Sequence, residues 1–217
     1  MSPQAKAKKK QKKRYVERPD NRAKLLDAAE TVFREEGYGA ATARRVAGLA
    51  GMNHQSVFYY FGSQEELLLA LLRRSTETYC KRMEEALDSD QPLRGLWNVV
   101  SDPHSTKIGM EFMALAHHNK TIRAEMARNS ENIRALEATA IERHLKERGI
   151  QPRLSPEFVS ILTNALARLL VQEANLGIHA GHDEAEALVD RSLLHFEAWG
   201  DANAEVEPIV AAMSSSG

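Results

Sequence analysis

Caps and helix breakers divide this chain into segments in which apolar residues recur at helical spacing. Asp20 can cap the first segment and Gly37 ends it, and its apolar positions follow a 3.6-residue period: Leu25, Ala28, Ala29, Val32 and Phe33. Only 12 glycines and 7 prolines interrupt the 217 residues, and no strand-like alternation of useful length occurs. The sequence therefore predicts an all-α protein.

We expect two short helices after the first one, the second over 54–60, with a turn at Gly51, where a positive φ suits glycine. Three polar residues can cap the helices of this region: Thr42, Asn53 and Ser63. Ser63 forms a capping box with Glu66, so a long helix should begin there and reach about Leu87. Five further segments bring the total to about nine helices: 92–101, 105–118, 119 to about 148, 155–177, and 183 to about 199, the last opened by a second capping box at Asp183 and Glu186.

Charge is distributed unevenly along the chain. Residues 1–18 hold eight lysines and arginines and one acid, although the net charge of the whole chain is -1. We interpret these residues as a disordered basic arm for a polyanion, in which Lys12, Lys13 and Arg14 are candidate DNA contacts. A merely solubilising tail is the alternative. Residues 201–217 are expected to form a frayed tail.

Several classes of protein are excluded by composition and motifs. A single cysteine, Cys80, excludes an internal disulfide framework, and the longest apolar run, 67–72, is far shorter than the roughly 20 residues of a membrane span. No apolar segment follows the basic N-terminus as in a secretory signal. Neither a catalytic triad nor a third ligand beside the histidine pairs is present. We therefore expect a cytoplasmic protein that is not an enzyme, with no membrane contact, no metal and no cofactor.

Residues 42–61 have the pattern of a helix-turn-helix, two short helices joined by a glycine-containing turn. Small or apolar residues suit the packing of the first helix across the second: Val46, Ala47 and Ala50. Val57 and Phe61 can pack inward from the second helix. Five other side chains would then face a DNA major groove, where polar groups read base edges and aromatic rings contact thymine methyls or phosphates: His54, Gln55, Ser56, Phe58 and Tyr60.

From Leu25 to Leu67 the sequence resembles the tetracycline-repressor (TetR) family of bacterial transcription regulators. The resemblance rests on about a dozen positions at matching spacing: Phe33, Gly37-Tyr38, Thr42, Val46-Ala47, Ala50-Gly51, Val57-Phe58, Phe61 and Ser63-Gln64-Glu65-Glu66-Leu67. It implies DNA contacts at Thr42, Arg44, His54, Gln55, Ser56, Phe58, Tyr60 and Gln64. Three positions depart from the family pattern: Phe58 replaces the usual tyrosine, Gln55 is larger than the usual residue, and Gln64 replaces the usual lysine.

The resemblance also implies how the rest of the chain is organised. Residues 19–66 would form the helix-turn-helix DNA-binding domain, and residues 67–200 a larger effector-binding and dimerisation domain. The last two helices would form a homodimer through wide apolar stripes, with these candidates: Phe158, Leu162, Leu169, Leu176, Leu188, Leu193 and Phe196. The middle helices would enclose an effector cavity, with these candidates: Tyr79, Met83, Trp97, Phe112, Met113, His117, Ile133 and Leu162. Simple core packing is the alternative for each of the latter residues.

These observations predict a ligand-responsive transcriptional regulator, a repressor in the first instance. It would bind a near-palindromic double-stranded operator as a dimer and be released by a small, mainly apolar effector. Two alternatives stay open. One is a structural or division-control factor of the same fold that needs no effector, and the other is a helical enzyme or carrier with a coincidental helix-turn-helix.

Overall fold

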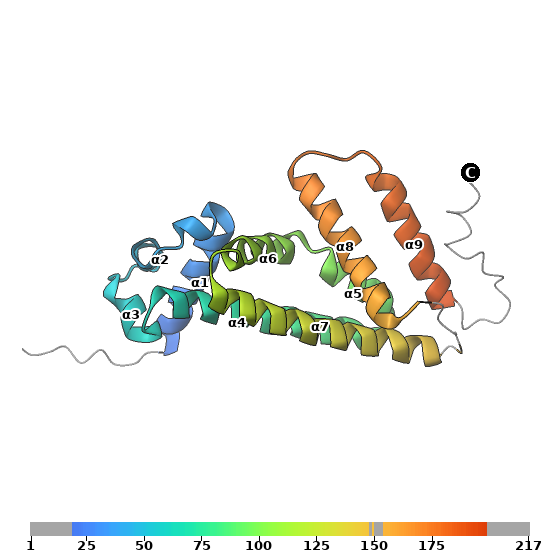
Figure 1. The fold of residues 1–217 in the computed structure, drawn as a ribbon, viewed down its shortest axis with the longest axis horizontal. Helices are drawn as coiled ribbons and strands as arrows, with labels where there is room; N and C mark the ends of the chain where they lie inside the picture. Colours follow the sequence, from blue (N-terminus) through green and yellow to red (C-terminus); the bar gives the residue numbers. More distant parts are fainter. Residues whose placement is uncertain (1–18, 148, 150–153, 199–217) are drawn as a thin grey trace, which may run out of the picture.

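The computed structural model describes residues 19–147, 149 and 154–198, and Figure 1 shows their arrangement. These residues form helices without any strand, which confirms the all-α prediction. The helices, with one short 3-10 helix (η1), are α1 Pro19–Glu36, η1 Tyr38–Ala40, α2 Ala43–Leu49, α3 Gln55–Phe61, α4 Gln64–Leu87, α5 Pro92–Val100, α6 Pro103–Ala116, α7 Lys120–Glu147, α8 Pro156–Asn175 and α9 His182–Ala198. The predicted basic arm, with Lys12, Lys13 and Arg14, and the predicted tail lie outside the described residues.

The molecule is elongated. Helices α1 to α3, called the head below, lie at one end, and α4 and α7 run along the long axis (Figure 1). Helices α8 and α9 form a hairpin toward the other end (Figure 1). Helices α4 to α9 are called the body below. Within the body, α6 contacts both the head, at α1 and η1, and other body helices, at α4, α7 and α8.

Two of the three caps predicted around the helix-turn-helix are confirmed by side-chain hydrogen bonds. The hydroxyl of Thr42 accepts from the backbone N–H of Arg45 at 3.2 Å, and that of Ser63 accepts from Glu66 at 3.0 Å. The third prediction, a cap at Asn53, is wrong: α3 begins at Gln55 with His54 at the N-cap position, and Asn53 lies one residue earlier, where its side chain accepts a hydrogen bond from the backbone N–H of Gln55 at 2.9 Å. Gly51 has φ 68° in the turn between α2 and α3, as predicted.

Other predicted boundaries are wrong by a few residues, because a proline or another cap begins the helix earlier. Helix α1 begins at Pro19, so Asp20 lies in the first turn and pairs with a lysine four residues later instead of capping. Helix α6 begins at Pro103 and is capped by Asp102 rather than beginning at 105. Helix α9 already includes residue 183, so the predicted second capping box does not start it. The sequence analysis also missed η1.

Two apolar cores hold the fold together. The first joins the head to the N-terminal half of α4, to α6 and to Ile122 of α7, and it contains Phe33 and Phe112, whose ring centroids lie 4.4 Å apart. The second core joins α4, α5, α7 and α8 around Met83. Helices α4 and α5 approach closely at Gly95, where a Cβ atom would lie 3.0 Å from a backbone oxygen of α4. Because the first core continues past residue 66, the head and the body share packing at their junction.

Candidate DNA-binding surface and ligand cavity

The helix-turn-helix is held by a small buried core. Val46, Ala47 and Val57 have no exposed surface, and Phe61 is also buried, as predicted from the sequence. A backbone hydrogen bond from Met52 to the carbonyl of Ala47, 2.8 Å long, closes the turn between the two helices. This packing fixes α3 on α2 and leaves one side of α3 toward solvent.

The exposed side of α3 carries the predicted readers Gln55 and Phe58, the latter with 48% of its surface exposed, and the predicted reader His54 is exposed just before the helix. Thr42 and Arg44 are exposed at the start of α2. The sequence analysis missed Tyr59, which is 52% exposed on α3 and contacts the ring of Tyr60 edge to face. A helical period applied from the inward pair at 57 and 61 would have placed residue 59 on the outward side.

Three predicted contacts are placed differently. Ser56 is buried at 3% exposure, which corrects the prediction that its side chain faces a groove, because it lies one position before inward Val57. Tyr60 is half-buried, and its hydroxyl accepts a hydrogen bond from the amide of Asn21 in α1 at 3.3 Å. Gln64 is also half-buried, and its side-chain oxygen accepts from the backbone N–H of Ala43 at 3.3 Å, at the start of α2. Tyr60 and Gln64 therefore brace the head.

The two adjacent arginines of α2 differ in electrostatic environment. Arg45 donates from Nε to both carboxylate oxygens of Glu36 at 3.0 Å, and this hydrogen bonding lowers the pKa of Glu36. Among the described residues, Arg44 has no such acidic partner. Of these two arginines, Arg44 is therefore the one whose positive charge is available to a phosphate or a base.

A cavity of about 490 Å³ lies in the body among α4, α5, α6, α7 and α8. Four of the eight predicted lining residues are found there: Tyr79, Phe112, Met113 and Ile133. The other four are not, and the prediction is corrected for them. Met83 and Trp97 pack in the second core, His117 is exposed at the end of α6, and Leu162 points outward from α8 with 54% of its surface exposed.

Polar side chains in the cavity wall were not predicted. The wall includes the carboxyl of Glu137, the polar residues Ser160 and Asn164, and four arginines, 74, 82, 134 and 168. These residues lie in α4, α7 and α8, far apart in sequence, so no local motif marks them. The prediction of a mainly apolar pocket with few polar groups did not anticipate this wall.

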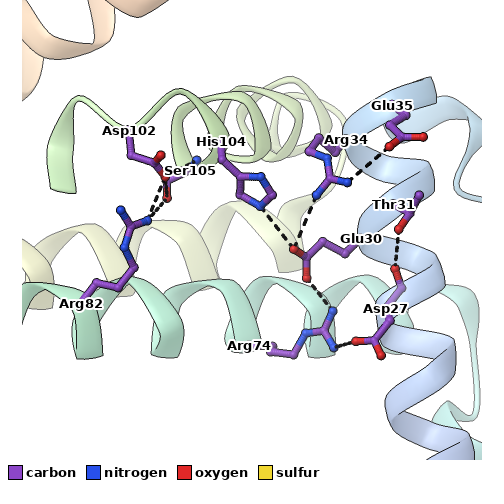
Figure 2. Close-up of polar contacts among 10 residues, drawn as sticks. All are labelled: Asp27, Glu30, Thr31, Arg34, Glu35, Arg74, Arg82, Asp102, His104 and Ser105. Atoms are coloured by element: carbon purple, nitrogen blue, oxygen red, sulfur yellow. Dashed lines mark hydrogen bonds and ion pairs between the residues drawn. The ribbon is translucent and has the colours of Figure 1, made fainter. Parts of the chain in front are cut away.

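An ionic network joins the head to the cavity wall (Figure 2). Arg74 of α4 donates to Asp27 and to Glu30 of α1, each at 2.6 Å, and His104 of α6 lies 3.4 Å from Glu30. Farther along, Arg82 donates to Asp102 at 2.8 Å. Burial would raise the pKa of Asp102, but hydrogen bonds from Ser105 and Arg82 outweigh it and lower that pKa to about 2.

A second link reaches η1. The backbone N–H of Tyr38 donates to a carboxylate oxygen of Glu111 in α6 at 2.8 Å. Glu111 and the cavity residue Phe112 are neighbours on α6, and Phe112 also contacts Phe33 of the head. A shift of α6 would therefore change both the cavity wall and the contacts of α6 with the head.

The hairpin of α8 and α9 exposes large apolar side chains. Among the predicted dimer residues, five are 43% to 76% exposed: Phe158, Leu162, Leu169, Leu176 and Leu188. Leu193 is half-buried, and the side chain of Phe196 lies outside the described residues. Phe158, Leu162 and Leu169 are spaced four and seven residues apart, so they share one side of α8.

Searches of the described ranges for other kinds of site were negative. None of the helices there has both the length and the hydropathy needed to cross a membrane. Nor do those ranges bring together three or more histidine, cysteine, aspartate or glutamate side chains that could hold a metal ion.

Comparison with known proteins identifies the head. Residues 25–71 match the model of a family described as bacterial regulatory proteins, tetR family. The transcriptional repressor NicS of Pseudomonas putida is 29% identical over 124 residues, 55% of this chain and 58% of NicS. The repressor AcnR of Corynebacterium efficiens is 32% identical over 84 residues, and the activator FasR of Mycolicibacterium smegmatis is 36% identical over 81 residues. These two matches cover 43% and 37% of the relatives, so the chain spans about half or less of their length.

Solved structures extend the likeness to the whole fold. A crystal structure of a TetR-family regulator from Rhodococcus sp. has a TM-score of 0.67 at 19% identity, covering 82% of this chain and 99% of that one. A transcriptional regulator from Pseudomonas aeruginosa PAO1 has a TM-score of 0.64 at 17% identity, covering 84% and 95%. At these identities the likeness concerns the fold.

The segment that matches the family model covers most of the helix-turn-helix head and the start of α4. Residues 25–71 therefore match the tetR-family model, and the fold of the described helices is similar to that of solved TetR-family regulators.

Proposed function

We propose that the protein is a dimeric, ligand-responsive repressor that binds a near-palindromic operator and leaves it when a small effector enters the cavity of the body. The observation that carries this proposal is the position of α6. It lines the cavity with Phe112 and Met113, and it contacts the head through Phe33 and η1. A ligand that moves α6 would act directly on the packing of the DNA-binding head.

DNA reading is assigned to the exposed side of α3, with Arg44 and Thr42 of α2 beside it. Gln55 can pair with a base edge, whereas Arg44 supplies positive charge. Since α3 is a single short helix, one head would read only one half-site. A two-fold dimer would place two such helices about one DNA turn apart and would require a near-palindrome.

The exposed apolar side chains of α8 and α9 support the dimer. Leu162 and Leu169 lie seven residues apart on α8 and are both about half exposed, so they share one side of that helix. A second copy of this chain, presenting the same face, would cover them in a four-helix arrangement.

Release would follow if the effector favours a form in which the two heads no longer fit adjacent half-sites. Moving the population from mostly bound to mostly free requires about 5 kcal/mol of difference in effector affinity between the two forms. The links at Arg74 and Glu111 are the contacts through which such a difference would reach the head.

The basic arm is proposed to add affinity that does not depend on sequence. Neutralised phosphates release counterions and make binding salt-dependent. Deleting residues 1–14 should therefore lower operator affinity and flatten its dependence on salt. An unchanged salt slope would contradict this role.

Selection of operators from a random DNA pool, at about 150 mM salt to suppress non-specific binding, tests the proposal. We expect an enriched near-palindrome, and Gln55→Ala should cost roughly 1–3 kcal/mol at one operator position only. Gln91→Ala, at an exposed position before α5, is the matched control and should bind like wild type. If no sequence is enriched, the structural-factor alternative would replace the repressor.

A further inference from the structure

The cavity wall contains a buried carboxyl group with an unused oxygen. Glu137 of α7 is 1% exposed. Its Oε2 accepts hydrogen bonds from the hydroxyl of Ser160 and from the amide of Asn164, the latter at 2.9 Å. Its Oε1 is fully buried and has no hydrogen-bond partner among the described residues.

A buried carboxyl oxygen without a hydrogen-bond partner destabilises the fold, so its presence calls for a physical explanation. Leaving such a group without a partner costs about 1–3 kcal/mol, and more if the group is charged. Burial raises the pKa of Glu137, although its hydrogen bonds and the charges of Arg168 and Arg134 oppose that shift. Both arginines are exposed residues, and neither forms an ion pair with Glu137. Ser160 and Asn164 alone would satisfy a structural role through Oε2 and would not require Oε1.

The surroundings of Glu137 indicate what could satisfy Oε1. Tyr79, also in the wall, is close enough that the charge of Glu137, after burial, contributes to raising its pKa, and the Tyr79 hydroxyl makes no hydrogen bond within the described ranges. Apolar side chains complete the wall around these polar groups: Leu72, Ile108, Phe112, Met126 and Ile133. The volume of about 490 Å³ lies in the range of small-molecule sites.

We propose that this cavity takes an organic cation with an apolar body, whose protonated nitrogen donates a hydrogen bond to Oε1 of Glu137. A donor N–H that carries a positive charge makes a stronger hydrogen bond to a carboxylate than a neutral donor does, and it would give Oε1 the partner that it lacks. Of the four arginines in the wall, Arg74 and Arg82 are paired with acidic side chains. The exposed arginines 134 and 168 would repel a cation near them, so its nitrogen has to lie at the buried carboxyl. The proposal rests on the cavity being the effector site.

Binding of three related probes to the full-length protein tests this. The probes are 4-phenylbutylamine, its alcohol analogue 4-phenylbutanol and its acid analogue 4-phenylbutanoate, each titrated by calorimetry at pH 7. The variant is Glu137→Gln, which keeps an oxygen for Ser160 and Asn164, and the control is Glu142→Gln at an exposed position of the same helix. Melting temperatures of the ligand-free proteins report whether each variant is folded.

We expect wild type and Glu142→Gln to bind the amine at least tenfold more tightly than the alcohol or the acid. In Glu137→Gln that preference should disappear, with the affinity for the alcohol unchanged. Equal binding of amine and alcohol, stronger binding of the acid, no binding of any probe, or an amine preference that survives in folded Glu137→Gln would each overturn the proposal.

Operator binding, measured separately, keeps the two proposals apart. If the protein selects a palindrome but shows no amine preference, the assignment to Glu137 fails and the repressor stands. If Glu137 selects the amine but saturating amine leaves operator binding unchanged, the ligand assignment stands and the effector role of the cavity fails.

Discussion

Replacing Phe112 by leucine tests the contact between Phe112 of the cavity wall and Phe33 of the head. The ring is 1% exposed, and its centroid lies 4.4 Å from that of Phe33, within the range of a stabilising aromatic pair. Loss of such a pair costs about 0.5–1.5 kcal/mol, and imperfect repacking around leucine adds up to about 1.5 kcal/mol. We therefore expect a total of about 1–2 kcal/mol, in the middle of the range that these two terms allow.

Urea unfolding followed by circular dichroism measures this loss, at one protein concentration for all variants because dimers gain stability with concentration. Phe58→Leu makes the same change at a side chain that is 48% exposed, and we expect less than about 0.5 kcal/mol there. If Phe112→Leu is no more destabilising than Phe58→Leu, then Phe112 does not hold the head to the body. The argument that α6 transmits a signal through this contact would then be refuted.

Three further substitutions test other features. The lowered pKa of Asp102 contributes stability that is present above about pH 4 and is lost as the pH falls toward 2. Asp102→Asn should therefore be about 1 kcal/mol less stable than wild type at pH 6 in urea unfolding, and the difference should be smaller at pH 3. Gly95→Ala places a methyl group 3.0 Å from the backbone of α4 and should destabilise by about 1 kcal/mol in thermal melts, whereas Gly109→Ala, with open space at its Cβ position, should be neutral or stabilising. Leu169→Glu on the exposed face of α8 should give a folded monomer in sedimentation, and Leu136→Glu, equally exposed on α7, should leave the dimer intact; a dimeric Leu169→Glu would exclude this face from the interface.

The head was predicted well because its signals are local. The cap at Thr42, the glycine turn at 51 and the inward pair Val57 and Phe61 all lie within 20 residues, and each is found where the sequence places it. Errors there concern side chains whose partners come from elsewhere. Tyr60 bonds to Asn21 of α1, a contact between residues 39 positions apart, and the sequence alone does not reveal which turn of α1 it meets.

The body was predicted less well because helical spacing shows which side of a helix is apolar but not what covers it. Leu162 and Met83 are both apolar, yet Leu162 is half exposed and Met83 is buried in the second core without lining the cavity. Four of the eight predicted cavity residues were nevertheless found in the wall.

The polar part of the wall is the least predictable feature and the most specific. Glu137 in isolation is one of many glutamates on a polar helix, with nothing in its neighbourhood of sequence to mark it as buried. It becomes distinctive only when α8 brings Ser160 and Asn164 to the same oxygen and leaves the other oxygen unpaired. In a fold whose helices pack mainly through apolar side chains, that choice is expensive unless a ligand completes it. The ligand chemistry that sets this protein apart from others of its fold is therefore to be sought in pairs of residues across α7 and α8, which no local sequence pattern marks.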